Sequence, residues 1–158
     1  MLVQMATANS VQAAKFVKRP NKPWEDYDYF DARNSEGHID LIQILGGIWK
    51  SSPSLNEIAA VCGIPGKLGI IGQEVAQLWL EGCLLEIVAY NECDALTTYL
   101  IWLRMAFFGG FFNQVQYEKE QESVRNLLST EGAIPVKEHL LEFLEAWKCH
   151  QVRNKRNI

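Results

Sequence analysis

The feature that most constrains the fold is one long and mainly apolar segment, Cys83 to Phe108, which ends just before Gly109-Gly110. Its apolar residues recur at helical spacing, so the segment is predicted to be nearly continuous helix with one buried face. The glycine pair predicts where that helix stops. The buried face is expected to consist of Leu84, Ile87, Val88, Leu96, Leu100, Trp102 and Leu103.

Part of this segment raises the question of a membrane. The run from Ala95 to Phe112 approaches the length of a spanning helix, but Arg104 lies in its middle, which favours a buried core helix. No membrane partner is therefore expected. The first residues lack the basic, apolar and small-residue pattern of a secretion signal, so the expected location is cytoplasmic, with reduced cysteines.

The remaining elements are also predicted to be helices. Ser54-Leu55-Asn56-Glu57 has the pattern of a capping box, which predicts a helix from Leu55 closed at Gly63. Almost no segment reads as a strand. The fold class is therefore mainly α, as expected of an α/β domain without its sheet-forming half. The other expected elements are helices at His38–Gly46, Gly72–Leu80, Tyr117–Leu128 and Val136–Cys149, a helical Met1–Ala14, an irregular Lys15–Gly37 and a frayed basic tail at Gln151–Ile158.

Composition excludes several classes of function. The 158 residues, 48% of them hydrophobic, are enough for one domain with a core. A formal charge of -4 provides no basic field for non-specific nucleic-acid binding. The four cysteines form no CxxC pair, which argues against a zinc site. The Pro65-Gly66-Lys67 turn lacks the GxxxxGK[ST] pattern of a nucleotide-binding P-loop.

Candidate chemistry lies within the long helix. Tyr90 and Asp94 are four residues apart, so the phenol and the carboxylate share one helix face. One interpretation is structural, with a half-buried tyrosine whose hydroxyl is hydrated and an aspartate on the solvent side. The other starts from the apolar neighbours of Asp94, because a carboxylate in such surroundings needs a partner, and a metal ion is one.

Three motifs together resemble a known family. They are HxDL at His38–Leu41, SLNEIA with GIPGK at Ser54–Lys67, and YxExDxLxTYLxxLR at Tyr90–Arg104. Residues 1 to about 115, together with the region of Trp147, resemble the C-terminal half of predicted 3′-5′ exonucleases related to the proofreading domain of family-B DNA polymerases. These belong to the tyrosine-type DEDD group of the ribonuclease H-like superfamily.

The resemblance implies a function and a site. It implies 3′-5′ phosphodiester hydrolysis by two divalent ions, Mg²⁺ or Mn²⁺, at a single-stranded 3′ end, with DNA favoured over RNA. Asp94 would ligate a metal ion, and Tyr90 would orient the attacking water. Residues 1–115 would form the C-terminal part of the exonuclease domain, and 116–158 its helical extension with the basic tail. Both parts would belong to an α/β ribonuclease H-like fold.

The sequence also departs from the family pattern. The family's Asp-x-Glu motif and its second aspartate motif are not found; Asp26-Tyr27-Asp28 and Phe30-Asp31 match neither. One carboxylate cannot hold two Mg²⁺ ions, so a truncated or split homologue with little activity alone is expected. The alternative is a non-catalytic helical remnant or interaction module. Apolar surface from Leu84, Leu96 and Leu100 is expected to be exposed, and to favour a homo-oligomer or a complementing N-terminal half.

Overall fold

The structure is a computed structural model that describes residues 39–46, 53–66 and 69–155, together with Ser10, Gln12 and Lys22. The chain separates into two compact units, Met1–Ser52 and Pro53–Ile158. The predictions for Met1–Ala14 and Lys15–Gly37 fall almost entirely outside the described residues, as do Asp26-Tyr27-Asp28 and Phe30-Asp31. Every regular element within the described ranges is a helix, in agreement with the mainly α expectation.

In the first unit the structure describes one helix, α3, at Leu41–Gly46. The backbone carbonyl of Asp40 accepts a hydrogen bond from the amide of Ile44 at 3.2 Å, which closes the first turn. Asp40 therefore lies at the start of this helix, within the range predicted to be helical. His38 lies outside the described residues.

The second unit begins with α4, Leu55–Cys62, whose two ends are fixed by local sequence. The Ser54 amide donates to the Glu57 carboxylate at 2.7 Å, and the Glu57 amide donates to the Ser54 hydroxyl at 3.3 Å. This is the predicted capping box, which satisfies amides that the first turn would leave unpaired. At the other end Gly63 adopts a left-handed φ of 66°, which a glycine tolerates without strain.

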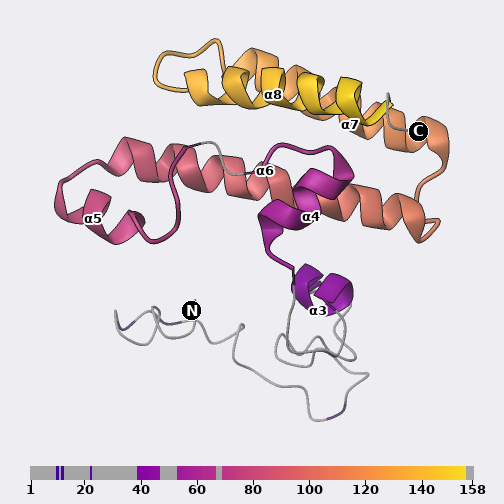
Figure 1. The fold of residues 1–158 in the computed structure, drawn as a ribbon, viewed down its shortest axis with the longest axis horizontal. Helices are drawn as coiled ribbons and strands as arrows, with labels where there is room; N and C mark the ends of the chain where they lie inside the picture. Colours follow the sequence, from indigo (N-terminus) through magenta and orange to yellow (C-terminus); the bar gives the residue numbers. More distant parts are fainter. Residues whose placement is uncertain are drawn as a thin grey trace. The chain divides into compact units, whose positions relative to one another are not determined.

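Helix α6, Leu84–Phe108, is the centre of the second unit. Four helices contact it: α4; α5, Val75–Leu80; α7, Gln114–Glu131; and α8, Glu138–Lys155. In Figure 1 the α7–α8 pair lies on one side of α6, while α4 and α5 lie on the other. The predicted long helix and its stop at Gly109 are confirmed.

The α7–α8 hairpin forms much of the core. Helix α7 starts with a second capping box, in which the Asn113 side chain accepts from the Gln116 amide at 2.9 Å. At its end Gly132 allows close packing, because a Cβ there would lie 2.7 Å from Cγ of Leu141. Phe143 and Trp147 of α8 are buried, as are Val124 and Leu128 of α7.

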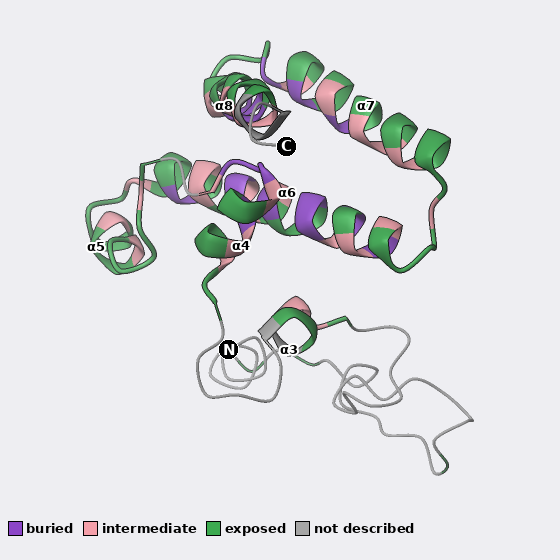
Figure 2. Ribbon diagram, turned by 45° about the vertical axis from the view of Figure 1, so that its right-hand side comes forward, coloured by how far each residue is buried: buried purple, intermediate pink, exposed green. Residues whose placement is uncertain are grey.

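Some burial predictions are wrong (Figure 2). Leu84 and Val88 were expected in the buried face of α6 but are exposed. Leu100 was expected to expose apolar surface but is only 3% exposed, because the α7–α8 hairpin and the end of α4 cover that half of α6. The expectation of exposed apolar surface is confirmed for Leu84.

The C-terminal end of α8 differs from the prediction. The segment predicted as a frayed tail from Gln151 continues as helix to Lys155, so the tail prediction is wrong over those five residues. No helix in the described parts of the chain is both long and apolar enough to span a membrane. The proposed division between residues 1–115 and 116–158 stays a prediction.

Candidate active site

The candidate residues lie on one face of α6. Positions 90, 94, 97 and 101 follow helical spacing, so their side chains share a stripe along the helix. Tyr90 and Asp94 are half-buried, whereas Thr97 and Ile101 in the following turns are buried. The stripe therefore runs from a partly open region into the core, with the tyrosine and aspartate at its open end.

A buried hydrogen bond fixes this stripe against the end of α4. Thr97 is 1% exposed, and its hydroxyl donates to the carbonyl of Pro65 at 2.9 Å. The left-handed turn at Gly63 directs Ile64 and Pro65 into the core, which brings that carbonyl to α6. Because the contact joins residues 32 apart in sequence, it anchors the helix one turn from Asp94.

The surroundings of Asp94 are partly apolar and negatively charged. Its backbone carbonyl accepts a hydrogen bond from the Thr98 hydroxyl at 2.8 Å. Burial raises the pKa of the neighbouring Cys93 thiol to about 11, with further contributions from Glu92, Asp94 and Glu142. The carboxylates of Glu92, Asp94 and Glu142 thus add to the effect of burial and disfavour a negative charge on this thiol.

A metal site needs more ligands than the described residues bring together. Mg²⁺ requires a nearly octahedral shell of oxygen ligands, and Asp94 offers one carboxylate. Across the described ranges, no group of three or more His, Cys, Asp or Glu side chains could hold a metal ion. These residues therefore do not fit a two-metal centre by themselves.

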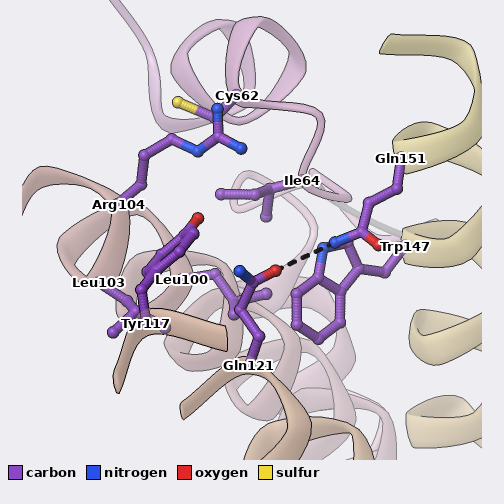
Figure 3. Close-up of a pocket in the computed structure, with 9 residues that line it drawn as sticks. All are labelled: Cys62, Ile64, Leu100, Leu103, Arg104, Tyr117, Gln121, Trp147 and Gln151. Atoms are coloured by element: carbon purple, nitrogen blue, oxygen red, sulfur yellow. Dashed lines mark hydrogen bonds between the residues drawn. The ribbon is translucent and has the colours of Figure 1, made fainter. Parts of the chain in front are cut away.

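Two features formed between different helices could not be predicted from the sequence: a side-chain contact and a small cavity. Nε2 of His139 in α8 lies 2.6 Å from Oε2 of Glu92 in α6, close to the candidate residues. A small polar cavity also lies beside Arg104 (Figure 3). Neither the His139–Glu92 contact nor the cavity has a sequence signal, because each is formed by residues on different helices. Among the residues of these two features, Arg104 had a sequence signal, as the last residue of the YxExDxLxTYLxxLR motif.

The comparison with protein families identifies the group to which the chain is related. Residues 1–147 match the family described as "Predicted 3'-5' exonuclease related to the exonuclease domain of PolB". The chain belongs to this family. The resemblance drawn from the three motifs is thus confirmed, and the match extends past residue 115 to Trp147 in α8.

The family match includes the helix that carries the candidate residues. It covers α6 with Tyr90 and Asp94, all of α7, and α8 as far as Trp147. No curated protein and no solved structure matches the chain significantly. Family membership supports an exonuclease-like domain, while the roles of individual residues stay predictions.

Proposed function

We propose that the chain provides part of a 3′-5′ exonuclease that hydrolyses phosphodiesters at the single-stranded 3′ end of nucleic acid, with DNA favoured over RNA. The observation that carries this proposal is the family match together with Tyr90 and Asp94 on one face of a helix anchored by Thr97. An anchored helix holds two side chains in a fixed relation, as a reaction centre requires.

In this proposal Asp94 gives one carboxylate to a site for Mg²⁺ or Mn²⁺, and Tyr90 orients the attacking water. Bound divalent ions in such a site polarise the phosphodiester and stabilise the leaving oxygen. The other acidic ligands come from outside the described residues, either from a complementing N-terminal half or from another chain. The chain alone then acts as a truncated or split homologue with little activity, in the cytoplasm.

Binding of Mn²⁺ tests the role of Asp94 directly. Paramagnetic Mn²⁺ should broaden the amide resonances of residues 90–98 in the wild type, and Asp94→Asn should remove this broadening. Glu86→Gln is the matched control, because it neutralises an exposed carboxylate in the first turn of the same helix. Broadening that is centred elsewhere, or that survives in Asp94→Asn, contradicts the proposal.

Activity is tested with a single-stranded DNA labelled at its 5′ end. The isolated chain should release few or no 3′ nucleotides with Mg²⁺ or Mn²⁺. If it degrades the strand efficiently and Asp94→Ala abolishes this, the exonuclease assignment stands and the need for outside ligands is refuted.

A second function is a non-catalytic interaction module, which the exposed apolar surface of α5 and the start of α6 favours. Trp79, Leu80 and Leu85 are each more than half exposed, which is more apolar surface than scattered single residues provide. Sedimentation would separate the cases. A homo-oligomer that Leu85→Glu dissociates, combined with absent Mn²⁺ broadening, would favour the module.

A further inference from the structure

A polar cavity lies near the opposite end of α6 from the exposed α5 surface. Its volume is about 10 Å³, enough for a single atom the size of a water oxygen. Four segments meet there: the end of α4 and its following turn, α6, α7 and α8 (Figure 3). We call it the Arg104 cavity; it is lined by Cys62, Ile64, Leu100, Leu103, Arg104, Tyr117, Gln121, Trp147 and Gln151.

The cavity lining contains hydrogen-bond donors and no carboxylate. Arg104 forms neither an ion pair nor a hydrogen bond through its side chain with any described residue, and the Tyr117 hydroxyl likewise has no such partner. The Tyr117 ring is held in place by stacking on Phe107 with centroids 4.5 Å apart. In a chain of net charge -4, a cation that pairs with no carboxylate of the described ranges is a position suited to an anion.

The amide of Gln121 adds a third donor. Its oxygen accepts from Nη2 of Arg125 at 3.4 Å and from Nε2 of Gln151 at 3.2 Å. These two bonds fix the amide so that its nitrogen lies on the side of Tyr117 in Figure 3. Figure 3 also shows the Arg104 guanidinium and the Tyr117 hydroxyl around the same space, beside Ile64.

A buried donor supports the same conclusion. Trp147 is only 3% exposed and lines the cavity, and its indole N–H makes no hydrogen bond with a described residue. Buried N–H groups are normally paired, so an oxygen atom supplied from outside would satisfy a group that the protein leaves open.

We propose that the Arg104 cavity binds one oxygen of a phosphodiester group in a single-stranded nucleic acid. This rests on the proposed function, which makes nucleic acid the substrate. Arginine, tyrosine and glutamine side chains are common donors to backbone phosphates, and arginine matches their geometry. The cavity admits one oxygen, and the rest of the phosphate stays at its mouth.

The position along α6 defines the role of this site. Arg104 follows Asp94 by ten residues, which corresponds to about 15 Å along a helix. A phosphate held there lies several atoms along the strand from Asp94, so the site positions the strand and takes no part in bond cleavage.

The test is binding of fluorescein-labelled dT12 to the full chain in EDTA, measured by anisotropy at several salt concentrations. Arg104→Gln should weaken binding about tenfold, since it removes a charged donor to phosphate. It should also reduce the slope of log K against log salt by about 0.7, the value for one contact to a single strand. Tyr117→Phe should weaken binding without changing that slope.

Lys148→Gln is the matched control, because it removes one exposed positive charge on α8 outside the cavity. Equal losses in Arg104→Gln and Lys148→Gln would overturn the proposal, as would unchanged binding in Arg104→Gln. Arg104→Lys keeps the charge and should restore the slope but only part of the affinity. If Arg104→Lys restores all of the affinity, the claim that binding needs the geometry of arginine in addition to its charge is wrong.

Two further measurements distinguish strand binding in the Arg104 cavity from binding of free phosphate and from metal binding at Asp94. If inorganic phosphate shifts the Arg104 side-chain NMR signals and dT12 does not, the site binds free phosphate and the nucleic-acid assignment is refuted. Asp94→Asn should bind dT12 as the wild type does in EDTA. Failure of Mn²⁺ binding at Asp94 is therefore distinguishable from failure of the Arg104 cavity.

Discussion

Both halves of α6 contain many apolar residues, but more of the large apolar side chains are exposed in the first half than in the second. In the first half Leu84, Leu85 and Val88 are exposed, and in the second half Leu100 and Leu103 are buried. The second half lies under the α7–α8 hairpin and the end of α4, whereas the first half is contacted by α5 near its start and reached by α8 at Glu92. Tyr90 and Asp94 lie where the open half becomes the packed half.

This difference shows what anchors the candidate site. Helical periodicity continues unchanged across both halves, so it cannot distinguish them; the neighbouring helices do. The packed half holds Asp94 through Thr97, and the open half leaves the apolar side chains of Leu84, Leu85 and Val88 exposed. If burial governs the energetics, substitutions in the packed half should cost far more stability than substitutions in the open half.

The largest expected effect is from Leu103→Ala compared with Leu85→Ala. Leu103 is 0% exposed, so its truncation should lower the free energy of unfolding by about 3 kcal/mol through lost contacts and a cavity. Leu85 is 64% exposed, so its truncation should change stability by about 0.5 kcal/mol or less. Urea unfolding measures both; comparable losses would mean that the open half is covered in solution.

Thr97→Val should have an intermediate effect. It removes the hydroxyl that bonds to Pro65 and leaves a buried carbonyl unpaired, which costs about 1–3 kcal/mol. Thr98→Val is the matched control, since Thr98 is exposed and its hydroxyl donates to the carbonyl of Asp94 in the preceding turn. If both variants lose the same stability, the buried hydrogen bond of Thr97 does not anchor the packed half of α6.

The smallest effect expected is from Ser54→Ala, which removes the N-cap of the helix that covers the packed half. At neutral pH it should cost about 1 kcal/mol, as measured by urea unfolding. Hydrogen bonds from the Ser54 amide and hydroxyl lower the pKa of Glu57 below its ordinary 4.5. The stabilisation from ionised Glu57 is therefore full above about pH 4.5 and is lost as the pH falls through the lower, folded-state pKa.

Asn113→Ala provides the control for this pH dependence. The Asn113–Gln116 capping box of α7 contains no titrating group, so its loss should cost the same at acidic and neutral pH. The cost of Ser54→Ala should shrink in acid. Equal pH profiles for the two variants would show that Glu57 is not coupled to the cap.

Elements with strong local signals were predicted well. The capping box at Ser54, the stop at Gly63 and the extent of α6 all depend on residues within a few positions of each other, so the sequence specifies them. The end of α8 was missed, because the basic composition after Cys149 resembles a tail while the helix in fact continues to Lys155.

The candidate site was predictable only in part. The i, i+4 spacing of Tyr90 and Asp94 was visible in sequence, and the family match supports the motif around them. The bond from Thr97 to Pro65, the contact of Glu92 with His139 and the Arg104 cavity were not visible. Each depends on how separate helices pack, for which short-range spacing carries no information.

By itself, the sequence determined which of the described segments contain helices, the caps of α4 at Ser54 and Gly63, and which family the chain belongs to. Tertiary structure alone decided which half of α6 is buried and which donors converge beside Arg104. The physical reason is that capping and helical period act over three or four residues, whereas burial depends on which distant helix covers a face.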